Sequence, residues 1–250
     1  MKYFIVFGLI TLSFMACKKQ TEDITATQGI TDIKLYYPMT VGNVFMYRMD
    51  STRLVNYTEF KTAYYLVKDT VAGTFLDGQG RTCYTVFRYI TDTLASQPYQ
   101  FSETHYIVYD QNKIEYVDGR NYRFIPLANP LSYSTTWNGN LYLDSAQLRI
   151  TDNTSYKGWT YQYTSINQPF SVLDSTYQNS ITIQQASDSS GVFDSNTLHS
   201  KTYSAEVYAK GVGLVYKEIM DLFFQPPTDN KAGYLEDNSF GVKLRLISHK

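Results

Sequence analysis

The chain has 250 residues, a formal net charge of -1 and only 18% charged residues. Such a balance provides no positive field to attract a phosphate backbone, so composition argues against nucleic acid as a partner. Aromatic residues make up 16% of the chain, and 24 residues are Tyr. Aromatic and β-branched side chains suit a pleated, half-buried surface, so composition favours strands.

The first residues have the layout of an export leader. Lys2 is followed by an uncharged apolar run, residues 3–15, and then by the small residue Ala16, which is the order of a basic start, an apolar middle and a small residue at the cleavage point. As a helix the run would span about 20 Å, short of the ~30 Å hydrocarbon layer that a transmembrane helix crosses. We therefore expect residues 1–16 to be a cleaved signal peptide.

Cys17 follows Ala16 directly, and this arrangement resembles a bacterial lipobox. The resemblance implies that the mature chain begins at Cys17 and that this residue carries diacylglycerol and an acyl chain such as palmitate. Each buried methylene contributes about 0.8 kcal/mol, so two or three chains hold a protein on a membrane permanently. The membrane would then be a partner through covalent lipid, and the protein an outer-membrane lipoprotein on the periplasmic or the surface face. An ordinary secretory leader is the alternative.

Residues 17–35 contain few large apolar side chains and show no regular period. We expect a flexible tether there, with a reach of about 3.3 Å per residue when it is extended. A single all-β domain is expected over residues 36–250, a length that can bury a substantial core.

From residue 43 onward, β-rich runs alternate with turn signals such as "LDGQG", "VDGRN" and "QPPTDN". No segment after the leader has the 3.6-residue apolar stripe of a helix. The expected strands are residues 44–51, 60–71, 81–91, 99–110, 113–117, 122–125, 159–164, 170–173, 181–185, 201–209, 214–224 and 242–248. Many short strands at hairpin spacing predict an all-β fold: an antiparallel sheet, a sandwich or an incomplete barrel.

The run "VYAKGVGLVYKEI", residues 207–219, has a β-favouring half on each side of Gly211 and Gly213. Glycine adopts positive φ without strain, so we expect a hairpin in which one of these glycines has positive φ. A phosphate-binding loop is the alternative, but that loop would need a helix after the glycines.

Two segments, residues 38–45 and 130–137, share a pattern of a proline, an adjacent apolar residue and an aromatic residue seven positions after the proline. A rigid lead-in of this kind can deliver an aromatic side chain into a core. We therefore expect Phe45 and Trp137 to be mostly buried.

Three motifs in this order after the lipobox, "YYPMTVGNVFMYRMDS", "NPLSYSTTW" and "YAKGVGLVYKEI", resemble those of a group of uncharacterised cell-envelope lipoproteins of the Bacteroidota. The last motif matches closely, whereas Phe45 stands where the group has Trp and Ser134 where it has Gly. The resemblance implies an envelope location and an all-β fold. It implies no activity.

The residues that could carry chemistry are few and scattered. His105, His199 and His249 have no metal or triad spacing, and the chain contains neither a Gly-x-Ser-x-Gly nor a His-Glu-x-x-His motif. His105 is interpreted as a sheet residue on the face of Glu103, and Cys83 as a small buried apolar residue without a disulfide partner. We expect no enzyme activity, no cofactor and no metal, with a carboxylate-based hydrolase as the least favoured alternative.

The segment "DSSGVFDSN", residues 188–196, has closely spaced oxygen ligands, but it lacks the calcium-loop pattern and reads as a solvated loop. A separate pattern, Asp followed by Ser or Thr, resembles the acceptor triplet of the general O-glycosylation system of Bacteroidota. The resemblance implies five candidate O-glycosylation sites, whereas ordinary turn chemistry explains the same pattern without modification. The candidates are Ser51, Thr70, Thr93, Ser145 and Ser175.

The sequence leaves two binding functions open for a non-catalytic envelope protein. In the first, exposed tyrosines form a platform for a glycan or an envelope protein, because these rings combine apolar area with a polar tip. In the second, the sheet curves into an incomplete barrel that carries an acyl chain or another apolar ligand. Carriers of that kind usually have a helical lid, for which the sequence shows no candidate.

Overall fold

The computed structural model describes residues 32–55, 59–144, 149–151, 154–191, 196–236 and 239–250. The strands are β1 (Val44–Val55), β2 (Glu59–Leu76), β3 (Thr82–Asp92), β4 (Gln100–Tyr109), β5 (Lys113–Val117), β6 (Arg123–Ala128), β7 (Thr136–Asn138), β8 (Arg149–Thr151), β9 (Thr154–Ser155), β10 (Thr160–Val172), β11 (Ser175–Ser190), β12 (His199–Ala209), β13 (Gly213–Gln225), β14 (Tyr234–Leu235) and β15 (Phe240–His249). Within these ranges the helical elements are two 3-10 turns, η1 (Ile33–Tyr36) and η2 (Tyr156–Gly158). Neither turn has the length or the apolar character needed to cross a membrane.

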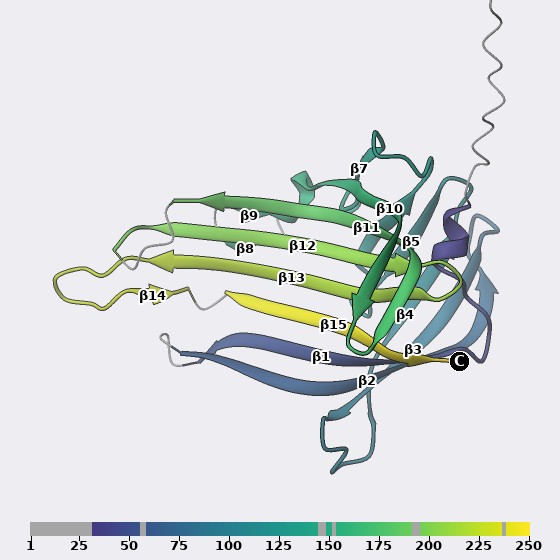
Figure 1. Cartoon of the computed structure of the whole chain (residues 1–250), viewed down its shortest axis with the longest axis horizontal. Helices are drawn as coiled ribbons and strands as arrows, with labels where there is room; N and C mark the ends of the chain where they lie inside the picture. The colour runs from purple at the N-terminus through teal and green to yellow at the C-terminus, as the bar shows by residue number, and fades with distance from the viewer. Residues whose placement is uncertain (1–31, 56–58, 145–148, 152–153, 192–195, 237–238) are drawn as a thin grey trace, which may run out of the picture. The chain divides into compact units, whose positions relative to one another are not determined.

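One 13-stranded sheet contains nearly all of the strands, in the order β6-β5-β4-β3-β2-β1-β15-β13-β12-β11-β10-β7, with β14 beside β13. The strands β8 and β9 pair separately. Two meanders, β1 to β6 and β10 to β13, are joined because the C-terminal strand β15 pairs antiparallel with both β1 and β13. Figure 1 shows this path, from the blue strands β1 and β2 through the yellow strand β15 to the green strands β13, β12 and β11. The all-β, antiparallel prediction is confirmed.

The two ends of the sheet order, β6 and β7, meet. The backbone N–H of Ile125 donates to the carbonyl of Gly139 at 2.7 Å, and the indole Nε1 of Trp137 donates to the carbonyl of Ile125 at 2.7 Å. On β10, the hydroxyl of Tyr163 donates to the carbonyl of Ala128 at 2.7 Å. These bonds satisfy polar groups that a sheet edge would otherwise leave unpaired, and they make the sheet a nearly closed barrel.

Alternate side chains along each strand point into this curled sheet. On β1, Phe45 and Tyr47 are buried, whereas Arg48 and Asp50 on the opposite face form an ion pair at 3.3 Å. The same alternation on the other strands brings both meanders to one hydrophobic core. The burial of Phe45 is as predicted; Trp137 is only half-buried, with its ring against Tyr163 at a centroid distance of 4.9 Å.

The observed strands follow the predicted ones closely and differ most in the C-terminal meander. The predicted strands 159–164 and 170–173 form the single strand β10, because three irregularities in its pairing with β11 absorb the polar segment between them. Asn167, at a φ of 54°, lies in that segment. The short strand β7 was not predicted, because its three residues pair only once the sheet curls.

The folded domain begins before the predicted boundary at residue 36. Asp32 caps η1 by accepting a hydrogen bond from the backbone N–H of Lys34 at 2.9 Å, and both Ile33 and Tyr36 are buried. The carbonyl of Leu35 accepts from the backbone N–H of Gly211 at 2.7 Å, which ties η1 to the turn between β12 and β13 (Figure 1). The end of the expected tether is therefore part of the core, and its remaining residues, 17–31, lie outside the described residues.

The glycine-rich motif forms the predicted hairpin. Gly211 and Gly213 have φ values of 77° and 112° between β12 and β13. These backbone angles are accessible to glycine and strained for other residues, so the motif sets the reversal that holds η1.

Closure of the sheet should depend on Gly139. A Cβ atom at this position would lie 2.1 Å from a ring carbon of Tyr161. We expect Gly139→Ala to lower the free energy of unfolding by about 2–3 kcal/mol, because the ring or the strand has to move. Gly78→Ala is the control, since its Cβ would meet nothing within 4 Å. Urea unfolding of both variants tests this, and equal stability of the two would contradict it.

Candidate functional site

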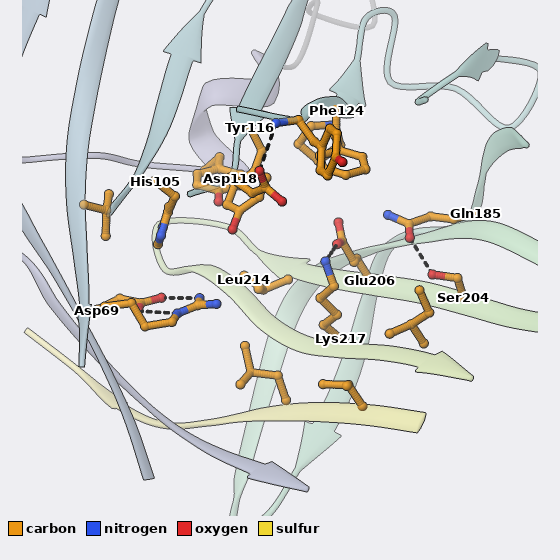
Figure 2. A pocket seen from close by; sticks show the side chains of 18 of the residues that line it. Asp69, His105, Tyr116, Asp118, Phe124, Gln185, Ser204, Glu206, Leu214 and Lys217 are labelled. Carbon is orange, nitrogen blue, oxygen red and sulfur yellow. Dashed lines mark hydrogen bonds and ion pairs between the residues drawn. The ribbon is translucent and has the colours of Figure 1, made fainter. Parts of the chain in front are cut away.

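The candidate site is a cavity inside the curled sheet, with a volume of about 450 Å³. Its lining comes from both meanders, from β15 and from the turn between β5 and β6. Figure 2 shows side chains from opposite walls pointing toward one another across it. Tyr37, directly after η1, and the largely exposed side chain of Arg120 in the β5–β6 turn both line it.

One wall, on β2, β3 and β4, carries an ion-pair cluster. Arg88 donates to both carboxylate oxygens of Asp69, at 2.8 and 2.7 Å, and also to Glu103 at 3.2 Å. Asp69 is 5% exposed. A buried carboxylate is tolerated only when it is paired in this way, and the two-pronged bond fixes the orientation of the guanidinium group.

The facing wall, on β11, β12 and β13, carries a second polar row (Figure 2). Lys217 forms an ion pair with Glu206 at 2.8 Å, and the hydroxyl of Tyr208 donates to the other oxygen of Glu206 at 2.6 Å. Ser204 donates to Gln185 at 2.6 Å. Each ionised group on this wall therefore has a partner from the same wall.

His105 differs from these groups. It is 4% exposed, it lines the cavity from β4, and its Nδ1 atom has no hydrogen-bond partner among the described residues. The pKa of His105 is lowered to about 4, mainly by burial and to a smaller extent by nearby Arg88, while Asp69 opposes the change. The imidazole ring, with its centroid 5.1 Å from that of Tyr116, is thus neutral at pH 7.

Three tyrosines in the same cavity lining as His105 also offer neutral polar groups. Tyr37, Tyr47 and Tyr116 line the cavity, and burial raises the pKa of each hydroxyl. No hydrogen bond of these three hydroxyls occurs within the described part of the chain. We call Tyr37, Tyr47, His105 and Tyr116 the neutral cluster.

The remaining lining is mostly apolar. Met49, Leu214, Ile219, Val242 and Leu244 come from β1, β13 and β15 and form a continuous apolar part of the wall, because these three strands are adjacent in the sheet. The cavity therefore combines an apolar surface with polar groups on two facing walls, and small-molecule sites usually combine the two kinds of lining.

Aromatic side chains also gather on the outer face of β2, β3 and β4. Phe75 and Tyr106 meet edge to face at 5.5 Å, and Phe101 meets Phe87 at 6.3 Å and Tyr89 at 5.9 Å. Phe101 is 59% exposed. We call these five residues the outer aromatic surface; it is the structural counterpart of the platform expected from the sequence, although phenylalanines contribute as much to it as tyrosines.

The structure keeps the predicted site residues apart. His199 stacks on Phe224 with a centroid distance of 4.7 Å and His249 is exposed at the end of β15, so neither of them joins His105. Cys83 is 2% exposed and free, as predicted, and burial raises the pKa of its thiol. Cys17 lies outside the described residues.

The five candidate glycosylation sites occupy different settings. Ser51 and Thr70 lie within β1 and β2, where each is paired on both sides by neighbouring strands. Thr93 is exposed in the turn after β3, and Ser175 is the first residue of β11, directly after the turn that follows β10. Ser145 lies outside the described residues, as does part of the segment 188–196.

Sequence reasoning missed most of the cavity residues. Asp69, Arg88, Glu103, Glu206 and Lys217 are charged residues inside otherwise β-rich runs, at positions where alternation places a core side chain. That mismatch was the available signal, because a charge on a buried face needs a partner from another strand.

Comparison with known proteins yields similarity at the level of solved structures. A scan against models of known families found no match, and a search of curated proteins found no significant relative. A protein from Bacteroides fragilis, provisionally described as exported and with a YmcC-like fold, has a TM-score of 0.42 and 8% identity over 86% of this chain and 98% of its own. A protein from Parabacteroides distasonis, provisionally described as a lipoprotein, has a TM-score of 0.41 and 10% identity over the same shares. The function is therefore argued from the cavity of this chain.

The buried His105 predicts a pH dependence of stability. Its pKa is about 4 in the folded chain, against about 6.5 in an unfolded chain. Below pH 6.5 the unfolded state binds a proton that the folded state does not. The neutral His105 therefore does not lower the free energy of unfolding above about pH 6.5. As the pH falls from there to about 4, the free energy of unfolding decreases by about 3 kcal/mol in all.

We expect His105→Gln to lack this part of the pH dependence. Urea unfolding of both proteins, at about pH 7.5 and about pH 4.5, measures it. Carboxylates are common to both, so their contribution cancels in the difference between the two proteins. The same loss of stability in variant and natural protein would show that His105 does not titrate with a lowered pKa.

Proposed function

We propose that this protein is a lipid-anchored, non-catalytic binding protein of the cell envelope that holds a small ligand inside its curled sheet. The observation that carries the proposal is the interior cavity of about 450 Å³, within the ~300–1,000 Å³ that small-molecule sites occupy. The apolar surface formed by β1, β13 and β15 supports a ligand with a substantial apolar part. Of the two binding functions that the sequence left open, the proposal corresponds to the carrier of an apolar ligand. It differs from that hypothesis in that the cavity also has polar groups.

The anchor is proposed from the sequence around Cys17, which resembles a lipobox. Lipid on this residue would give the membrane contact to the acyl chains, so the β-domain needs no apolar surface of its own for attachment. The location as an outer-membrane lipoprotein rests on the same resemblance.

The arrangement of charges supports a non-catalytic role. A general acid or base needs a carboxyl group that is free to exchange a proton with a substrate. Asp69 and Glu103 both accept from Arg88, and Glu206 accepts from Lys217 and Tyr208. These carboxylates are engaged in ion pairs and hydrogen bonds within the protein, so the hydrolase alternative has little support.

The outer aromatic surface favours a second candidate function, the binding of a glycan or an envelope protein. Exposed rings such as Phe101 offer apolar area on a face that the described chain leaves uncovered. The rings meet one another edge to face, so they present a ridged surface rather than a flat stacking platform. The cavity is the better-formed site.

Binding of the uncharged fluorescent probe N-phenyl-1-naphthylamine tests the interior site. The probe should gain fluorescence with the natural protein, because it enters the apolar part of the cavity. Leu214→Trp and Ile219→Trp, which fill that part, should weaken probe binding about 10-fold or more. Fluorescence titration measures the change.

The matched control is Phe101→Ala, which removes an exposed ring of the outer aromatic surface. This variant should bind the probe with unchanged affinity. The opposite pattern, with binding lost in Phe101→Ala and kept in both tryptophan variants, would transfer the function to the outer surface and overturn the interior site.

The lipid anchor has its own test. Cys17→Ser removes the only thiol that the lipobox-like sequence offers, so we expect the variant to lose lipid attachment and to leave the membrane fraction or accumulate as a precursor. A truncated chain that begins at Thr21 should keep the melting temperature of the full protein, because it retains η1. Detergent partitioning and melting curves measure these outcomes. Membrane retention of Cys17→Ser after a carbonate wash would contradict the anchor.

A further inference from the structure

We infer that the interior site binds an uncharged amphiphile, whose hydroxyl, ester or amide head is held by the neutral cluster, and that it discriminates against ionised heads. This inference rests on the proposed function, because it names the ligand class of the same cavity. The observation behind it is that, among the described residues, the ionised groups on the cavity walls are already paired, whereas the neutral cluster is not.

The neutral cluster supplies unused hydrogen-bonding capacity at one place. His105 and Tyr116 lie side by side on the neighbouring strands β4 and β5, with ring centroids 5.1 Å apart, and Tyr37 and Tyr47 line the same cavity. In addition to burial, Tyr47 and Tyr116 raise the pKa of the Tyr37 hydroxyl. The buried Nδ1 atom of His105 has no partner among the described residues. A buried polar group without a partner is costly, so a ligand that supplies one gains affinity.

A neutral head can both donate hydrogen bonds to the neutral cluster and accept them from it. Neutral imidazole has one donor and one acceptor nitrogen, and each phenol is both donor and acceptor. A hydroxyl, ester or amide group can therefore pair with the neutral cluster without bringing charge into the cavity.

An anionic head meets cations that already have carboxylate partners. Among the described residues that line the cavity, Arg88 is engaged by Asp69 and Glu103, and Lys217 is engaged by Glu206. Arg120 is engaged by Asp118 at 3.4 Å. A carboxylate would have to leave water and either stay unpaired or break one of these ion pairs, and each course carries a large desolvation cost. We therefore expect the cavity to bind an ionised fatty acid weakly.

A cationic head meets carboxylates that already have partners. Asp69 and Glu103 accept from Arg88, and Glu206 accepts from Lys217 and Tyr208. A cation would have to leave water and compete with these partners, at a large desolvation cost.

The apolar surface accounts for the other end of the ligand. Met49, Ile219, Val242 and Leu244 belong to the same cavity as the neutral cluster. A molecule that places its head at His105 can therefore lay its apolar part along β1, β15 and β13, where each methylene that leaves water adds affinity.

The test is displacement of bound N-phenyl-1-naphthylamine from the full chain by three molecules with the same alkyl chain: decanol, decanoate and decylammonium. At pH 7.5 we expect decanol to displace the probe at a concentration about 10-fold lower than either ion. If decanoate or decylammonium competes as well as decanol or better, this inference is overturned while the interior site stands. If the probe does not bind in the cavity at all, the proposed function fails first.

Two variants assign the head group to the neutral cluster. Tyr47→Phe removes one hydroxyl and should weaken decanol about 5-fold more than it weakens the probe; Tyr116→Phe serves as a second variant should the first not fold. Tyr106→Phe is the matched control, because Tyr106 follows His105 on β4 with its ring on the outer face against Phe75. Equal loss of decanol and probe affinity in both cluster variants would show that the hydroxyls do not recognise the head.

Discussion

The meeting of β6 with β7 is the contact on which the interior depends. Without the bonds of Ile125 to Gly139 and Trp137, the two meanders would end in open edges and the polar walls would face solvent. Gly139 allows the approach because any side chain there would collide with Tyr161. The contact closes over a cavity rather than a fully packed core, and the proposed function rests on that cavity.

Closure of the sheet also changes how much the pairing of charges on the inner face matters for stability. In a flat sheet, Asp69 and Arg88 would form an ordinary exposed pair on neighbouring strands, with little effect on stability. Inside the curled sheet the same pair has to be fully matched, and so does the pair of Glu206 and Lys217. The ion pairs thereby neutralise the walls, and the groups left without partners are the neutral ones. Recognition through uncharged groups follows from that division.

The segment around η1 lies between the proposed lipid anchor in the sequence and the cavity. Its hydrogen bond to Gly211 and the burial of Ile33 make the start of the domain part of the core, and Tyr37, directly after it, is a member of the neutral cluster. The chain that leads from the proposed lipid anchor therefore reaches the ligand site within a few residues of entering the fold.

Local chemistry in the sequence was enough to predict the strands, the hairpin at Gly211 and Gly213 and the burial of Phe45 and Cys83, because alternation, positive φ and apolar character act over a few residues. It could not place β7, the start of the domain at Asp32 or the cavity. Those depend on pairings between residues far apart in the chain, such as Trp137 with Ile125 and β15 with both meanders. His105 shows the difference: the sequence placed it on a sheet face with Glu103, and only the curling of the sheet turned that face into the wall of a site.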